Sequence, residues 1–369
     1  MADIEWFMTK EMDSTMKDLV LGALREGFRT SFEELIKSSG PVDVLAAMKP
    51  HMMVIYGSYF DGIKKAMQIK GDGPEALLTV WQAGQEFVIP SDKLEAEITE
   101  LGGVGIAHQC PFSNSIPEIC VYMSHMGTEA VCGLVNPEYE CLFTHHMTNG
   151  DPYCRYIFKK KTQHLNNPND LGRTIVKLPE LKIPEVHLFA MQLGGITMQW
   201  NGVTSAYVQM NGAEKARSVL IPNAHKIGEE TGRKIKEMIP TAGQNAETLG
   251  QLATSLTKVL NQKGTSTFIS DKEFVRQITD CSCQTFSPEF CVQLGSLMDG
   301  IVQVLNPEYE FRYDRMITQG DRTCHWAIRK KSIAGPYPGE SAVELLKKRL
   351  VKGEINEAEY KKLKQLIDG

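Results

Sequence analysis

The sequence predicts an α+β protein of two tandem homologous domains, each with helices and a small antiparallel sheet, followed by a short helical hairpin. The main observation is an internal repeat. The segment NPEYECLFTHHMTNGDPYCRYIFKKK at 136–161 recurs as NPEYEFRYDRMITQGDRTCHWAIRKK at 306–331, at a constant offset of 170. Such self-similarity indicates that one structural module occurs twice. The hydrophobic pattern upstream is also shared, since helical spacing precedes a β-like stretch in both halves.

Length and composition are those of an ordinary globular chain. The 369 residues are 42% hydrophobic and 23% charged, with a net charge of −5, and a chain this long normally forms about two domains. No Lys/Arg block interleaves with aromatic residues, so we expect no nucleic-acid partner. No run reaches the ~18 apolar residues of a membrane span, and no signal-peptide core opens the chain, so we expect a cytoplasmic protein. Nine scattered cysteines indicate reduced thiols.

Helices are predicted first in each half, because apolar residues recur at helical spacing. The expected segments are 13–38, 42–49, 51–70 and 76–86 in the first half and 219–238 and 246–260 in the second. The segments 51–70 and 219–238 are counterparts, since each carries a proline near its start. Ser-Asp-Lys follows the helices in both halves.

Strand, helix and hairpin then follow in that order. The predicted strands are 103–110, 139–147 and 153–160 in the first half, with counterparts in the second that begin at 274–281. Pro117 and Pro288 stand where the first turn of a helix tolerates proline. Asn149-Gly150-Asp151 and Gln319-Gly320-Asp321 supply residues that favour a tight turn.

Prolines mark the boundary between the halves. The segment KLPELKIPEVH at 177–187 predicts an extended connector, because proline interrupts helices and central strands. The apolar segment 189–199 fits a buried strand or an interface, and the sequence leaves both open. We therefore assign 1–175 to the first repeat, 176–188 to a linker, 189–333 to the second repeat and 334–369 to a linker with the helical hairpin.

The C-terminal segment AVELLKKRLVKGEINEAEYKKLKQLID at 342–367 predicts two short helices joined at Gly353, with Asn356 and Glu359 capping the second. It resembles the SHOCT domain, a short C-terminal oligomerisation domain. A helical pair this small buries too little apolar surface alone. The resemblance therefore implies a homo-oligomer formed through the C-terminal helices.

A strand ending in cysteine, a Pro-Glu helix and a hairpin of the form Thr-x-Gly-Asp-x-x-Cys resemble the family named for L-2-amino-thiazoline-4-carboxylic acid hydrolase. The resemblance is strongest over 110–161 and 281–331. The same pattern is more distantly similar to the 4-vinyl reductase domain, a small-molecule-binding module with Cys-rich metal sites. The resemblance implies a hydrolase that opens a C–N bond of a cyclic thio-amidine, although the tandem copy departs from the single unit of most relatives.

The candidate site residues are thiols, carboxylates and one imidazole. A catalytic site would use Cys110, Cys154, His145 and Glu140, with the imidazole activating a thiol. A zinc or iron site would use residues that recur at matched positions. These are Cys110, Cys120, Glu138 and Cys154 in the first copy and Cys281, Cys291, Glu308 and Cys324 in the second. The alternative is that the thiols pack as small hydrophobic residues and the carboxylates are solvated.

Three functions remain open. The chain is a hydrolase-like protein that acts on or binds a small heterocyclic or carboxylate-bearing compound, a non-catalytic small-molecule- or metal-binding sensor, or an oligomeric scaffold. The second copy carries Arg315 in place of His145, so we expect it to bind a charged ligand without the chemistry. Asp151 and Asp321 are expected to bond nearby backbone amides in their turns.

Overall fold

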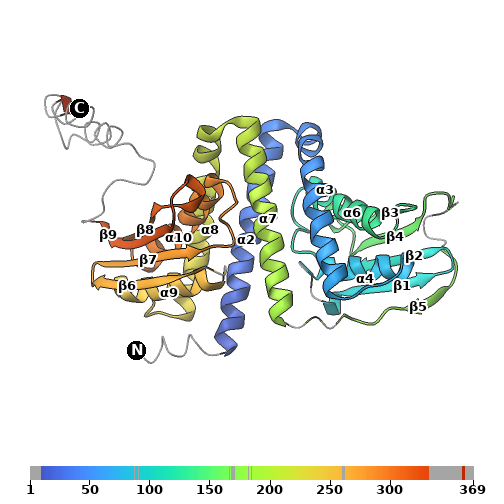
Figure 1. Cartoon of the computed structure of the whole chain (residues 1–369), viewed down its shortest axis with the longest axis horizontal. Coiled ribbons are helices and arrows are strands. Elements are labelled where there is room, and N and C mark those ends of the chain that lie inside the picture. Colours follow the sequence, from blue (N-terminus) through green and yellow to red (C-terminus); the bar gives the residue numbers. More distant parts are fainter. Residues whose placement is uncertain are drawn as a thin grey trace. The chain divides into compact units, whose positions relative to one another are not determined.

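The computed structural model describes residues 10–86, 88–89, 91–165, 167, 171–181, 183, 185–259, 262–331 and 360–361. Within them the fold is α+β, as predicted, with helices and two small antiparallel sheets (Figure 1). The predicted C-terminal helical hairpin, and the oligomerisation assigned to it, fall outside the described residues except at Tyr360 and Lys361.

The chain passes through the same order of elements twice. The first pass comprises α2 (Lys10–Ser39), α3 (Pro41–Ala66), α4 (Pro74–Gln85), η1 (Ser91–Lys93), β1 (Leu94–Thr99), β2 (Gly102–Ala107), α5 (Glu118–Cys120), η2 (Val121–His125), α6 (Met126–Val135), β3 (Tyr139–His145), η3 (Met147–Asn149) and β4 (Cys154–Lys160). The second comprises α7 (Glu185–Asn211), α8 (Ala213–Met238), α9 (Ala246–Val259), β6 (Lys263–Ser270), β7 (Glu273–Asp280), α10 (Pro288–Leu305), β8 (Tyr309–Arg315), η4 (Ile317–Gln319) and β9 (Cys324–Lys330). A short strand, β5 (Thr174–Lys177), lies between the two passes. This order agrees with the tandem repeat in the sequence.

The chain forms two compact units. One is Leu24–Ala216, which we call the N-terminal unit; the other joins the chain up to Ala23 to the chain from Arg217 onwards, and we call it the C-terminal unit. The units divide after α7, whereas the prolines of the sequence mark a linker at 176–188. The boundary lies after α7, and not before it, because α7 packs with the first repeat. In the order of elements, however, α7 belongs to the second repeat, where it corresponds to α2 of the first.

Hydrogen bonds hold α7 in the N-terminal unit. Gln192 Nε2 donates to the Glu86 carbonyl (2.9 Å), and Trp200 Nε1 donates to Ser31 Oγ (2.9 Å). The segment 189–199, for which the sequence left a strand and an interface open, lies within α7 and is helical. The expected connector 177–187 is shorter than predicted, since Lys177 still pairs with β1 and α7 begins at Glu185.

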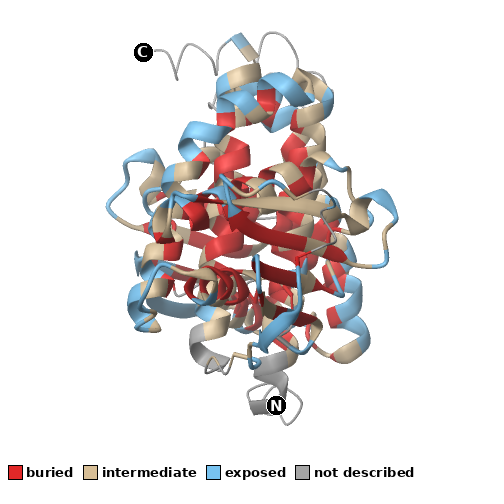
Figure 2. Ribbon diagram, turned by 90° about the vertical axis from the view of Figure 1, so that its right-hand side faces the viewer, coloured by how far each residue is buried: buried red, intermediate tan, exposed pale blue. Residues whose placement is uncertain are grey.

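The sheet of the N-terminal unit has the order β3-β4-β2-β1-β5. The hairpin β3-β4 pairs beside the incoming strand β2, with Cys154 opposite Ala107. Helix α4 packs on β1 and β2, α6 packs on β3, and α3 packs on α4 and α6. Buried residues accordingly gather where the helices meet the sheet, and exposed ones lie on the outer sides of the helices, in loops and at the sheet edge (Figure 2).

The C-terminal unit has the sheet order β6-β7-β9-β8, with α9 on β6, β7 and β9 and α10 on β8. Helices α8 and α10 approach each other backbone to backbone. A Cβ added to Gly228 would lie 2.0 Å from the Leu297 carbonyl oxygen, and one added to Gly300 would lie 2.2 Å from the His225 carbonyl oxygen. Only glycine fits at these two contacts.

The hairpin turns form as the sequence predicted. Gly150 and Gly320 have φ values of 91° and 98°, in the left-handed region that favours glycine. Asp151 Oδ2 accepts the His146 N–H (2.7 Å), and Asp321 Oδ2 accepts the Met316 N–H (2.9 Å). These two aspartates are turn residues. No helix in the described part of the chain is long and apolar enough to cross a membrane.

Candidate functional site

Three of the predicted thiols line one cavity of the N-terminal unit. Cys110 lies beyond the end of β2, Cys120 ends α5, and Cys154 opens β4. Because β4 pairs with β2, the hairpin brings Cys154 back beside the chain that leads to Cys110. The cavity has a volume of about 60 Å³. On the scale where one water needs roughly 10–15 Å³, it has room for about four to six waters.

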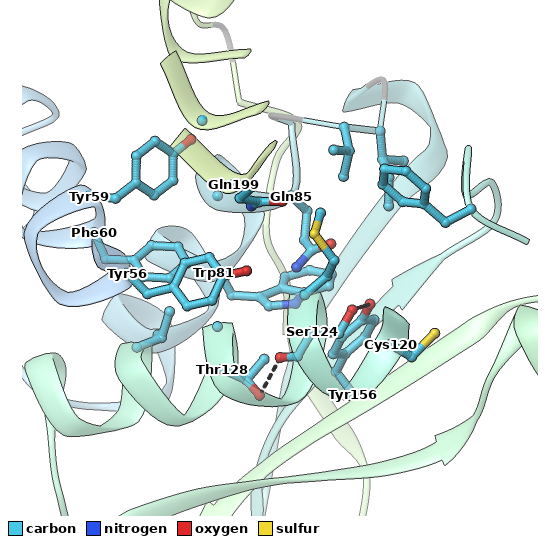
Figure 3. A pocket seen from close by; sticks show the side chains of 18 of the residues that line it. Tyr56, Tyr59, Phe60, Trp81, Gln85, Cys120, Ser124, Thr128, Tyr156 and Gln199 are labelled. Atoms are coloured by element: carbon cyan, nitrogen blue, oxygen red, sulfur yellow. Dashed lines mark hydrogen bonds between the residues drawn. The ribbon is translucent and has the colours of Figure 1, made fainter. Parts of the chain in front are cut away.

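The cavity walls are aromatic and uncharged. Tyr56 and Phe60 come from α3, Trp81 from α4, and Tyr156 from β4, and Figure 3 shows these rings with Cys120 at one side. Among the described residues that line the cavity, none is Asp, Glu, Lys, Arg or His. Such a space suits a neutral ligand, because a charge would lose its hydration without gaining a partner.

A π-helical turn, η2, forms part of the wall. The chain from Cys120 to Asn136 is one residue longer than the corresponding chain from Cys291 to Asn306, and the extra residue is accommodated as η2 between α5 and α6. Met123 and Ser124 of this turn line the cavity, and the Tyr122 carbonyl accepts the Tyr56 hydroxyl (3.3 Å). Turns of this kind occur frequently at functional sites.

Two buried polar atoms of the lining residues have no hydrogen-bond partner within the described structure. They are Trp81 Nε1, a donor, and Gln199 Oε1, an acceptor, on side chains that are 1% and 4% exposed. Gly105 of β2 makes room for the indole, since a Cβ there would lie 2.6 Å from the Trp81 ring. A buried unpaired polar group costs roughly 1–3 kcal/mol.

Burial keeps the three thiols neutral. It raises the pKa of Cys110 to about 12 and that of Cys154 to about 11, and it also raises the pKa of Cys120. The Cys110 sulfur accepts the Phe112 N–H (3.4 Å), the Cys154 sulfur accepts the Met147 N–H (3.3 Å), and Cys120 bonds Thr148 Oγ1 (3.1 Å). These bonds offset the burial only in part, so the thiols are weak nucleophiles at neutral pH.

The predicted carboxylates and imidazole lie elsewhere. Glu138 is exposed, with Lys160 Nζ 4.0 Å from its carboxylate, and Glu140 pairs with Lys159 across the hairpin (2.6 Å). The His145 ring packs on Tyr153, with centroids 4.8 Å apart. None of the three lines the thiol cavity. The hairpin therefore brings together the thiols of the predicted site but not its acid and base.

His125, which the sequence analysis did not select, forms a pair with His146, the neighbour of His145. His125 Nε2 is 3.1 Å from His146 Nε2, and Phe143 stacks on the His125 ring with centroids 3.9 Å apart. Burial lowers the pKa of His125 to about 4 and also lowers that of His146. The pair is neutral at pH 7. Its only signal in the sequence is that His125 falls in the segment that is one residue longer than its counterpart.

The second copy keeps three thiols at the matching positions and adds a fourth. Cys281, Cys291 and Cys324 are buried, and Cys283 adds a fourth buried thiol where the first copy has Phe112. A hydrogen bond from the Cys283 thiol lowers the pKa of Cys281 to about 7, and the Cys283 N–H also donates to the Cys281 sulfur (3.4 Å). Glu308 is exposed and pairs with Lys330 (3.0 Å).

The C-terminal unit also has an open pocket of about 590 Å³ between α8, α10 and β8. Its lining includes His225, Lys226, Glu229 and Asp299. The Asp299 carboxylate raises the pKa of His225, with Nε2 and Oδ2 3.5 Å apart. Charged groups thus line this pocket, whereas they do not line the thiol cavity.

The predicted zinc or iron site requires several donor side chains that converge on one point. No group of three or more His, Cys, Asp or Glu side chains among the described residues is arranged to hold a metal ion. No family model, curated protein or solved structure matches this chain significantly.

Proposed function

We propose that the N-terminal unit binds a small neutral heterocycle in the thiol cavity, and that binding is the function of this site. The ligand carries a hydrogen-bond acceptor for the Trp81 indole N–H and a donor for the Gln199 side-chain oxygen. The observation that carries the proposal is the pair of buried polar atoms without a partner in the described structure, set in an aromatic cavity.

Aromatic walls and sulfur atoms suit a flat ring. Stacked or edge-to-face aromatic contacts are worth about 0.5–1.5 kcal/mol beyond the area that they bury, and sulfur contacts with rings add about 0.3–1.5 kcal/mol. Cys110, Cys120 and Cys154 then act as soft, polarizable wall atoms. This explains why three thiols converge without a base to activate them.

Hydrolysis has weaker support. A thiol nucleophile needs a lowered pKa or an adjacent base, and here burial raises the pKa of Cys110 and Cys154 while His145 and Glu140 lie outside the cavity. Zinc or iron binding, a cytoplasmic location and assembly through the C-terminal helices stay predictions from the sequence.

Calorimetric titration with 2-pyrrolidinone, 2-pyridone and pyrazole tests the proposal, because each is a small neutral ring with a donor and an acceptor. Gln199→Leu keeps the size of the side chain and removes the acceptor, and Trp81→Phe keeps a ring and removes the donor. Since one hydrogen bond contributes about 0.5–1.5 kcal/mol, each change should weaken binding about 3- to 10-fold.

The matched control is Trp326→Phe in the C-terminal unit, where another buried indole N–H has no partner in the described structure. This change should leave binding unaltered. Gln199→Leu should not lower the thermal stability of the free protein, because it removes an unpaired buried group. The proposal is wrong if none of the three rings binds, or if all three variants bind like the parent.

A further inference from the structure

An apolar groove of about 690 Å³ lies between α3 and α7 of the N-terminal unit. Its lining includes Ile63 of α3, Met67 just after that helix and Met191 of α7, and the described lining residues include no charged side chain. Methionine side chains are flexible and polarizable, so they adapt to apolar ligands of different shape.

Small residues keep the groove open. Gly62 and Ala66 on α3 and Ala190, Gly194 and Gly195 on α7 all line it. A Cβ added to Gly62 or to Gly194 would meet no atom within 4 Å. The groove therefore exists because side chains are missing on both helices, and each of these glycines offers a place to fill it.

The groove adjoins the thiol cavity. Tyr59, Gly195 and Met198 line both spaces, so the two spaces are neighbours. Tyr59 belongs to α3, and Figure 3 shows it on the side of the cavity where Gln199 of α7 lies. The inner space is small and carries the polar atoms, whereas the outer space is about ten times larger and apolar.

We propose that the groove between α3 and α7 binds an apolar tail of the same ligand whose ring occupies the thiol cavity. The ligand is then a neutral heterocycle with a hydrocarbon chain of several carbons. This inference rests on the proposed function and adds the tail to it. The three lining residues that the two spaces share and the absence of charge along the described lining favour a chain of this ligand over a charged peptide.

The test is an affinity series of 2-pyrrolidinones with methyl, propyl, pentyl and heptyl groups at ring carbon 5, measured by calorimetry on the full chain. Burying one CH₂ is worth about 0.8 kcal/mol, or about fourfold in affinity. The affinity should rise by about this factor per carbon until the chain outgrows the groove.

Gly62→Leu and Gly194→Leu place a side chain in the groove. Both positions are helical, where leucine is favoured over glycine, so the fold should be kept. Each change should remove most of the gain from methyl to heptyl and leave the affinity for the methyl compound within about twofold. Gly57→Leu is the matched control, because Gly57 lies on α3, has no atom within 4 Å of an added Cβ and lines neither space. It should preserve the whole series.

Three results would overturn the inference. If the methyl compound binds as well as the heptyl compound, the ring site stands and the tail site is refuted. If no member of the series binds, both the tail site and the proposed function are refuted. A fall in the light-scattering mass of Gly62→Leu or Gly194→Leu, with an unchanged series, would make the groove a contact between copies of this chain.

Discussion

The two units carry residues of opposite size at matching positions of α3 and α8. In the C-terminal unit, Gly228 lets the backbone of α8 touch the backbone of α10. At the matching positions of α3, offset by 172, stand Tyr56 for Gly228 and Phe60 for Gly232. Their rings line the thiol cavity. The difference teaches that one repeat uses glycines to bring two helix backbones into contact, and the other uses aromatic residues at the matching positions to line a small cavity.

The helix-to-sheet contacts show the same exchange of large and small residues. In the N-terminal unit Trp81 rests on Gly105, and the corresponding pair in the C-terminal unit is Ala253 and Arg276. The large residue has moved from helix to strand. Of these large residues, Trp81 lines the thiol cavity.

The largest effect should come from breaking the close approach of α8 and α10. Gly228→Ala places a methyl group 2.0 Å from a backbone oxygen, which side-chain motion cannot relieve. We expect a loss of about 3 kcal/mol in the free energy of unfolding, at the upper end for overpacked cores, measured by urea denaturation. Gly57→Ala, in α3, is the control and should be neutral or stabilising by up to about 1 kcal/mol. Equal stability of the two variants would contradict the comparison.

The second largest expected difference between the two units is in the ionisation of their thiols. The pKa of Cys281 is lowered to about 7, whereas those of Cys110 and Cys154 are raised to about 12 and 11. As pH rises from 6 to 9, the rate of iodoacetamide alkylation at Cys281 should therefore increase with a midpoint near 7, and Cys110 and Cys154 should stay unreactive. Peptide mass spectrometry reads each site.

Access to a buried thiol scales the rate but does not move the midpoint of the pH profile. Cys283→Ala removes the thiol that donates to Cys281, so it should shift that midpoint to higher pH. An unchanged midpoint in this variant, or matching profiles at Cys281 and Cys110, would show that the two thiol groups have the same environment.

Sequence reasoning predicted the repeat, the order of helix, strand and hairpin, and the turn role of Asp151 and Asp321. It missed β5 and β6 because they are almost wholly exposed and lack an apolar face, and it also missed β1, although that strand is partly buried. It left α7 undecided, because FAMQLGGITMQ is largely apolar and contains two glycines.

The candidate site was predictable only in part. Recurrence at matched positions selected the thiols, and strand pairing brought them together. Trp81 and Gln199 were missed because their polar atoms matter only once burial and missing partners are known, which local sequence does not contain. Comparison of Tyr56 and Phe60 with Gly228 and Gly232 could have indicated the cavity, since it exchanges large residues for the smallest one.

The most direct test uses the two indoles that lack a partner in the described structure, Trp81 and Trp326. Proteins labelled with ¹⁵N at tryptophan are titrated with 2-pyrrolidinone, and Trp81→Phe and Trp326→Phe assign the two indole N–H signals. The account predicts that the Trp81 signal moves downfield, as a new hydrogen bond requires, while the Trp326 signal stays in place. A fixed Trp81 signal at saturating ligand, or equal movement of both signals, would contradict the claim that the cavity of the N-terminal unit is the binding site.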